Sequence, residues 1–175
     1  MSGLTQNTFV FRYGTGDNSQ PTSYPIGANQ TLYYGEVALL SGSGSVTTGY
    51  LKNAATAGSA DIVAGMVGDP AGGTYVETGS GIVGGTTDGA VWANVQTGAF
   101  FFQSGTGSDQ LSEATAGKTV YYGGENSSGP LAMATSGSST RPVLGVQLAQ
   151  DPGIAGGSTP GGSYWPVVLN AVPRP

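Results

Sequence analysis

Short runs of β-branched and aromatic residues recur along the chain, and polar turn residues separate them. In the run 91–96, Val91 and Val95 fall on one face of an extended segment, and Trp92 and Asn94 fall on the other. Clusters of Gly, Ser, Asn or Pro bound nearly all of these runs, as is typical of strands. The pattern predicts strands at 31–34, 36–40, 49–54, 62–67, 74–77, 90–97, 99–103, 118–122, 142–149 and 164–170.

Helices of ordinary length are not expected, because glycine recurs too often. The longest stretch without glycine, 163–175, contains three prolines, whereas an average helix needs about 11–12 residues without such breakers. Only 108–116 tolerates a single helical turn, with Ser108 as a candidate N-cap. Thr97-Gly98 predicts a tight hairpin between 90–97 and 99–103. The predicted fold class is therefore all-β: a small β-barrel or β-sandwich-like body of short strands with long Gly-rich loops.

The first thirty residues differ from the rest. Residues 8–13 alternate, which places Phe9, Phe11 and Tyr13 on one side of an extended segment. A polar stretch with two prolines follows at 14–25. The sequence thus predicts an extended N-terminal arm at 1–30 and a β-rich body at 31–175. An ordinary first strand of the same sheet is the alternative.

The predicted arm carries the aromatic and apolar side chains that we expect to contact a partner. These candidate partner contacts are Phe9, Phe11, Tyr13, Tyr24 and Ile26.

Composition narrows the class of function. Charged residues make up 9% of the chain, against about 25% in average proteins. The chain is nevertheless 38% hydrophobic, and its aromatic residues fall in β-like runs, so we expect it to be folded. The absence of Cys and His excludes disulfides and thiolate metal sites, and removes the commonest general base. The net charge of −5 argues against a nucleic-acid partner. Neither a secretion signal nor a membrane span is visible, so we expect synthesis in a cytoplasm.

Motifs that carry chemistry are weak. Residues 79–84 match the dinucleotide pattern G-x-G-x-x-G, but the following 85–89 cannot begin the helix that this pattern requires. No Gly-x-Ser-x-Gly elbow occurs. A pair of glutamates could in principle hydrolyse a glycoside, although none lies in a sequence context that suggests a cleft; the glutamates are Glu36, Glu77, Glu113 and Glu125. The sequence therefore predicts a protein that is not an enzyme, with no catalytic residue, cofactor or metal.

The order of strand and turn signals over about 31–170 resembles one family. The segments that carry the resemblance are 35–40, 62–68, 89–100, 116–122, 142–149 and 164–170. Together they are similar to the capsid decoration (cement) proteins of tailed bacteriophages, in the group with a small β-barrel-like body. The resemblance implies a homotrimer on the exterior of the virion, near local three-fold positions. There it would bind the major capsid protein and clamp neighbouring subunits, often with an N-terminal arm.

The resemblance implies no nucleic-acid partner, no membrane partner and no cofactor, and the acidic net charge suits an outer surface. A carbohydrate- or receptor-binding module of a phage fibre is the alternative, with Trp92, Tyr164 or Trp165 as glycan contacts. A small hydrolase with a carboxylate pair is a third reading. The long loops 68–89 and 151–162 are expected to face solvent or a neighbouring protein.

Overall fold

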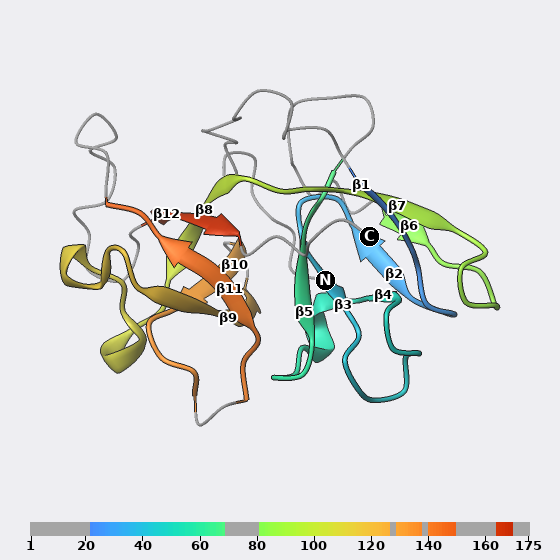
Figure 1. The fold of residues 1–175 in the computed structure, drawn as a ribbon, viewed down its shortest axis with the longest axis horizontal. Coiled ribbons are helices and arrows are strands. Elements are labelled where there is room, and N and C mark those ends of the chain that lie inside the picture. Colours follow the sequence, from blue (N-terminus) through green and yellow to red (C-terminus); the bar gives the residue numbers. More distant parts are fainter. Residues whose placement is uncertain (1–21, 69–80, 127–128, 138–139, 150–163, 170–175) are drawn as a thin grey trace.

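The fold is seen in a computed structural model, which describes residues 22–68, 81–126, 129–137, 140–149 and 164–169 (Figure 1). Within these ranges there is no α-helix, and the regular structure consists of strands and 3₁₀ turns. The predicted all-β fold class is confirmed.

The strands form three sheets. A five-stranded sheet has the order β1 (Thr22–Pro25), β7 (Trp92–Gln96), β5 (Ile62–Val67), β3 (Val37–Leu40) and β4 (Leu51–Lys52). A closed barrel has the order β10 (Gly129–Met133), β8 (Ala99–Ser104), β12 (Tyr164–Leu169), β11 (Val143–Gln147) and β9 (Thr119–Asn126). The third sheet pairs β2 (Thr31–Tyr33) with β6 (Gly81–Val83).

Most predicted strands are present, several with shorter bounds, whereas β8 and β9 extend beyond their predicted ends; β1, β6 and β10 were not predicted. The predicted strand 74–77 lies outside the described residues. The window 108–116 holds parts of two 3₁₀ turns, η3 (Gly107–Asp109) and η4 (Glu113–Thr115). Their N-cap residues are Thr106 and Ser112, so the predicted N-cap at Ser108 is wrong.

The predicted hairpin at Thr97-Gly98 is also wrong. β7 pairs with β1 and β5, whereas β8 pairs with β10 and β12. The chain runs on at Gly98 from one sheet into the other, and β7 and β8 form one long path across the molecule (Figure 1). The Gly98 carbonyl instead accepts a hydrogen bond from the Leu169 N–H at 2.9 Å. A glycine between two alternating runs fits such a crossing as well as it fits a turn.

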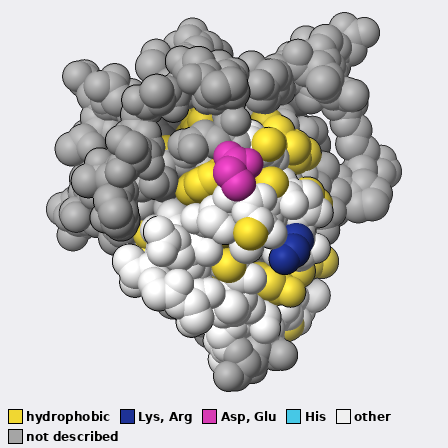
Figure 2. Space-filling model, turned by 90° about the vertical axis from the view of Figure 1, so that its left-hand side faces the viewer, with side chains coloured by type: hydrophobic (Ala, Val, Ile, Leu, Met, Phe, Trp, Pro, Cys, Tyr) yellow, Lys and Arg dark blue, Asp and Glu magenta, His cyan; other side chains and the backbone are white. Residues whose placement is uncertain are grey.

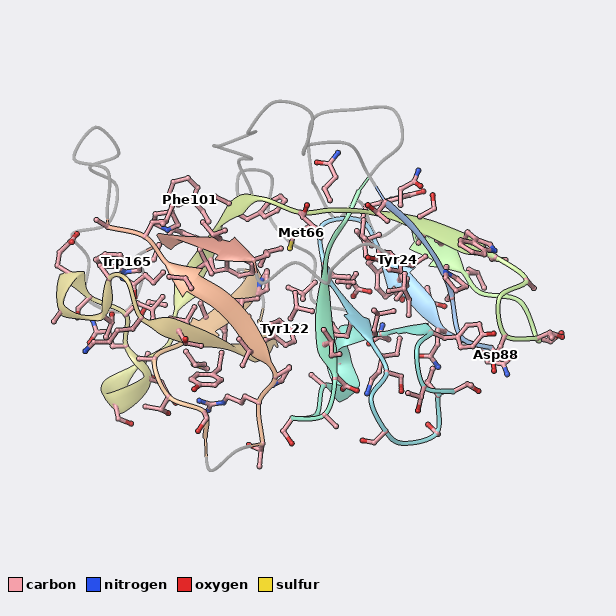
Figure 3. All side chains as sticks on the ribbon, in the orientation of Figure 1. Tyr24, Met66, Asp88, Phe101, Tyr122 and Trp165 are labelled. Atoms are coloured by element: carbon pink, nitrogen blue, oxygen red, sulfur yellow. The ribbon has the colours of Figure 1, made fainter. Side chains whose placement is uncertain are left out.

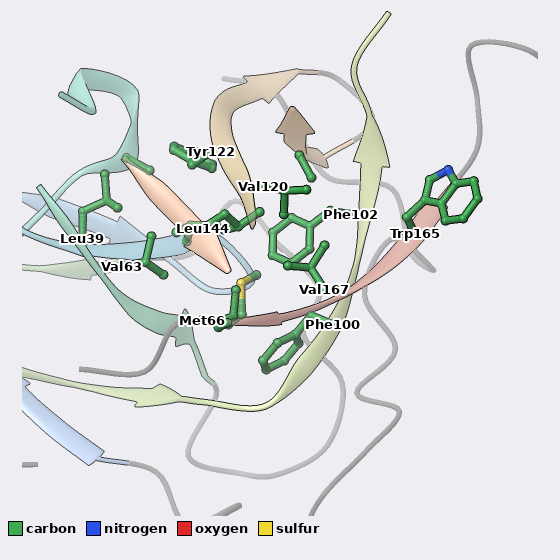
Figure 4. Packing of buried hydrophobic residues seen from close by; sticks show 14 of the residues in the cluster. Leu39, Val63, Met66, Phe100, Phe102, Val120, Tyr122, Leu144, Trp165 and Val167 are labelled. Carbon is green, nitrogen blue, oxygen red and sulfur yellow. The ribbon is translucent and has the colours of Figure 1, made fainter. Parts of the chain in front are cut away.

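The closed barrel (the second barrel hereafter) contains one parallel pair, β8 with β10. An odd number of strands cannot alternate in direction all the way round a ring, so one pair must be parallel. The remaining pairs are antiparallel. Large buried side chains fill its core (Figure 4): Phe100, Phe102, Val120, Tyr122, Leu144 and Val167.

The five-stranded sheet (the first barrel hereafter) also curls towards closure. Directly after β1, Ile26 forms a parallel bridge with Leu51 on β4, the strand at the opposite edge. The Gly27 N–H donates to the Leu51 carbonyl, and the Ile26 N–H donates to the Val91 carbonyl, both at 2.9 Å. Ile26 is wholly buried, because it lies in the seam that brings the two edges of the sheet together.

Residues 22–30 therefore do not behave as the predicted arm. β1 is hydrogen-bonded to β7 along its length, and the bridge at Ile26 continues it across the seam. The alternative expectation, that the predicted arm with its aromatic run at 8–13 is a first strand of the same sheet, concerns residues that lie largely outside the described ranges. Proline at 25 does not prevent this pairing, since β1 lies at the edge of its sheet and proline is tolerated there.

The two barrels lie side by side (Figure 1). Alternation along β3 and β5 divides their side chains between two clusters. Ala38, Ala64 and Val67 belong to the core of the first barrel. Val37, Leu39, Val63 and Met66 belong to the cluster that includes the core of the second barrel (Figure 4). The outer face of β3 and β5 is thus the contact between the barrels.

Candidate interaction surface

The two barrels have the same topology. Taken in chain order, β1, β3, β4, β5 and β7 of the first barrel correspond to β8, β9, β10, β11 and β12 of the second. In both barrels the first strand neighbours the fifth, then come the fourth, the second and the third. In both, the third strand meets the first in a parallel contact. The chain therefore contains one five-stranded unit twice.

The match extends to the register of individual residues. The pairs of β3 with β5 correspond to those of β9 with β11: Val37↔Met66 to Thr119↔Val146, Ala38↔Gly65 to Val120↔Gly145, and Leu39↔Val63 to Tyr121↔Val143. Each ladder shifts register at the same place, which leaves Ala64 in one barrel and Leu144 in the other as the extra, bulged residue. Agreement in register and bulge is far more specific than agreement in strand order.

Glycines at equivalent places support the same correspondence. A Cβ atom on Gly65 would lie 2.4 Å from the Gln96 carbonyl oxygen, and one on Gly145 would lie 1.9 Å from the Val168 carbonyl oxygen. Both contacts join the fourth strand to the fifth at the bulge. Only glycine allows the two backbones to approach this closely.

The repeat is hard to see in the sequence. Its clearest local trace is Val63-Ala64-Gly65 against Val143-Leu144-Gly145. In a chain with 32 glycines, a three-residue match of this kind has little significance without the register. This signal was missed.

Equivalent faces of the two barrels differ in exposure. Val63 and Met66 are buried between the barrels. Their equivalents Val143 and Val146 are 40% and 42% exposed, and the neighbouring Val168 is 39% exposed. We call these three side chains the valine face. They surround a shallow hollow of about 240 Å³ whose other lining residues are Thr119, Gly145 and Leu169.

The valine face contains no charged side chain. Figure 2 shows hydrophobic side chains reaching the surface at the second-barrel end of the molecule, with few charged groups among them. Exposed apolar groups in a cluster are typical of a surface that packs against another protein.

The predicted contact residues fall into two groups. Phe9, Phe11 and Tyr13 lie outside the described residues. Tyr24 pairs with Ala93 and packs, half-buried, against the first-barrel core (Figure 3). Ile26 is wholly buried, so its side chain is not available to a partner.

The predicted glycan contacts also differ from one another. Trp92 is 58% exposed, and Tyr164 is half-buried. Trp165 is buried in the second-barrel cluster and offers no open ring face (Figure 3). The long loops 68–89 and 151–162 lie largely outside the described residues, apart from Gly68 and 81–89, where β6 lies.

A buried ion pair precedes β5 in the first barrel. Lys52 Nζ lies 2.8 Å from Asp61 Oδ2, and both side chains are buried. Asp61 also accepts hydrogen bonds from the Gly42 and Gly58 N–H groups. Burial raises the pKa of Asp61, but donation from Lys52 and from the two backbone N–H groups outweighs burial and holds this pKa below its usual value. The pair thus ties β4 to the loop that holds Gly42 and to the loop 57–61 before β5.

Two further carboxylates hold loops at the surface. Asp109 lies 3.0 Å from Arg141 and accepts from the Thr135 hydroxyl, and donation from Arg141 is the main cause of its lowered pKa. Asp88 accepts from the Thr47 hydroxyl and the Ala28 N–H, which lower its pKa. The hydrogen bonds and lowered pKa values of both carboxylates therefore follow from their role in holding surface loops.

Among the described residues, no group of three or more His, Cys, Asp or Glu side chains is placed to hold a metal ion. No helix in the described ranges is long and apolar enough to cross a membrane. Comparisons of the chain with protein-family models, with curated proteins and with solved structures found no match.

Proposed function

We propose that this chain is a structural virion protein that binds the outer surface of an assembled phage capsid as a homotrimer. It cements neighbouring major capsid subunits and so stabilises the head. The observation that carries the proposal is the valine face: an uncharged, exposed apolar surface on a closed barrel, suited to packing against a neighbouring copy in the trimer. The order of strand and turn signals, which resembles decoration proteins, supplies the identity of the partner.

The energetics suit attachment in many copies. Full burial of a valine is worth about 1.5 kcal/mol, so completing the burial of three valines that are already more than half buried adds about 2 kcal/mol. Such a contact is weak alone. Between copies that are already held on one shell, it gains strength because each further contact forms at high effective concentration.

The arm supplies the contact with the shell. It is now confined to residues 1–21, with Phe9, Phe11 and Tyr13 as its candidate contacts, since Tyr24 and Ile26 belong to the first barrel. Burial of both phenylalanine rings against a capsid would contribute on the order of 3–6 kcal/mol. The net charge of −5 favours the outside of the shell, away from packaged DNA.

The test is to add purified protein to bare, expanded shells and to measure what sediments with them. We expect saturable binding at three copies per local three-fold position, and a higher temperature of shell disruption. Shells that already carry their decoration protein are the control and should bind none. Failure to sediment with bare shells at micromolar protein would contradict the proposal.

One observation favours the alternative, a carbohydrate-binding module of a phage fibre. Trp92 is 58% exposed on β7, and an open indole face can stack on a sugar ring. This reading predicts glycan binding that Trp92→Ala abolishes. The cement proposal predicts that Trp92→Ala sediments with shells like the unchanged protein.

A further inference from the structure

We propose that the valine face of the second barrel binds the first barrel of another copy of this chain, at the end marked by Ile62, so that copies associate head to tail. The inference deepens the proposed function and rests on it only for the number of copies, three. The contact itself is argued from the repeat.

The molecule already contains one example of this contact. The outer face of β3 and β5 in the first barrel packs on the second barrel, where β5 contacts β11 and η2 (Ala54–Thr56) contacts β9. Val63 and Met66 are fully enclosed there. The valine face is the same face of the repeated unit, with Val143 and Val146 in the same register positions. In the second barrel none of the described residues covers it, and Val143, Val146 and Val168 are exposed.

The surface that receives this face also occurs twice. On the second barrel it includes the start of β11, where Pro142 is buried. The Tyr122 N–H donates to the Pro142 carbonyl, which makes Pro142 the equivalent of Ile62, the partner of Leu40 in the first barrel. Ile62 is 52% exposed. The end that is covered in the second barrel is therefore open in the first.

Each of the two surfaces therefore occurs twice in the chain. One copy is buried in the contact between the chain's own barrels, and the other copy is exposed. The valine face is free on the second barrel, and the Ile62 end is free on the first. Joining them between copies repeats the internal contact and joins two different surfaces, which generates a ring if the rotation closes and a filament if it does not. A ring of three chains would contain six barrels and would satisfy every valine face.

The first test compares charged substitutions in the full chain by sedimentation equilibrium. Val146→Asp and Ile62→Asp should each weaken self-association at least tenfold, while circular dichroism shows that the monomer stays folded, because both side chains are exposed. Val83→Asp is the matched control, since Val83 is more exposed and lies on β6, away from both surfaces. It should associate like the unchanged chain.

The second test distinguishes head-to-tail from face-to-face contact. A chain with Val146→Asp keeps its Ile62 end, and a chain with Ile62→Asp keeps its valine face. An equimolar mixture should therefore form one dimer and nothing larger, although neither variant associates alone. If two valine faces met each other, Ile62→Asp would associate normally and mixing would restore nothing.

The absence of cysteine allows a third measurement. A mixture of Val146→Cys and Ile62→Cys chains should give crosslinked dimers under oxidation, and each chain alone should give few. The proposal is overturned if the unchanged chain stays monomeric even at 100 times the concentration used in the first test. It is also overturned if the Val146→Asp chain associates like the unchanged chain. None of these three measurements uses shells, so loss of shell binding alone would count against the proposed function and not against this contact.

Discussion

The two barrels share topology, register and bulge, but they are filled and closed differently. Positions with alanine inside the first barrel carry larger residues in the second: Ala38, Ala64 and Ala93 correspond to Val120, Leu144 and Trp165. The second barrel closes through paired strands, Leu131↔Gln103 and Ala132↔Ser104. The first closes through a single bridge at Ile26.

This difference shows that the pairing of the strands and the volume of the interior side chains are determined separately. Hydrogen bonds, the bulge and the close glycine contact define the path of the chain in both units. The size of the interior side chains then decides what else is needed to fill the core. In the first barrel, Leu32 from the separate β2–β6 sheet joins the cluster, which supplies volume that its alanines lack.

Truncation gives the largest expected effect on this comparison. A chain that begins at residue 22 retains both barrels and should keep a single cooperative unfolding transition. A chain that begins at residue 31 lacks β1 and the Ile26 seam, which leaves an edge of β7 unpaired and opens the first-barrel core. We expect it to lose the cooperative transition or to aggregate. Calorimetry of both chains makes the measurement. A normal transition in the shorter chain would show that the seam is dispensable.

Substitution of the equivalent glycines comes next. Gly145→Ala and Gly65→Ala each place a methyl group against a backbone carbonyl of the fifth strand, which cannot move without breaking the ladder. Each should lower the free energy of unfolding by about 4 kcal/mol or more. Gly58→Ala is the control, because its nearest neighbour would be 3.7 Å away. Denaturant unfolding that shows a small loss for one glycine alone would mean that the repeat is less strict than its register indicates.

The residues that precede Ile62 and its equivalent Pro142, Asp61 and Arg141, are both charged, but their environments differ. Asp61→Ala leaves Lys52 buried without its carboxylate and should cost about 3–5 kcal/mol. Arg141→Ala removes a partly exposed partner of Asp109 and should cost about 0–1 kcal/mol. Denaturant unfolding of both variants measures the difference. Equal losses would contradict the burial assigned to the Lys52–Asp61 pair.

The smallest expected effect is that of acid pH on the stability that the Lys52–Asp61 pair contributes. Because the pKa of Asp61 is lower in the folded chain than in the unfolded chain, the unfolded state binds more protons as pH falls. The stabilisation by Asp61 is complete above its ordinary pKa of about 3.9 and is lost as pH falls through the folded value. The melting temperature should therefore fall in acid, and Asp61→Asn should make this fall shallower. A parallel pH profile for the variant would assign the acid effect to the surface carboxylates Asp88 and Asp109.

The sequence alone was sufficient for the all-β class and for most strands. Frequent glycine and proline interrupt every candidate helix, and short apolar runs mark strands locally, so both properties can be read within a window of about ten residues. The candidate interaction surface could be predicted from the sequence only in part. Val143 and Val146 lie inside a predicted strand, but nothing in the local pattern distinguishes their outer face from a buried one.

The tertiary structure decided which strands pair. The sequence placed Tyr24 and Ile26 in the predicted arm, but in the structure Tyr24 pairs with β7 and Ile26 forms a bridge to β4. Gly98 looked like a hairpin turn, although the strands that it joins belong to different barrels. A strand's hydrogen bonds are made to residues distant in sequence, so its partner, its register and the exposure of its faces follow from the assembled sheet and not from its own residues. For the same reason the repeated barrel, and with it the free valine face, became visible only in three dimensions.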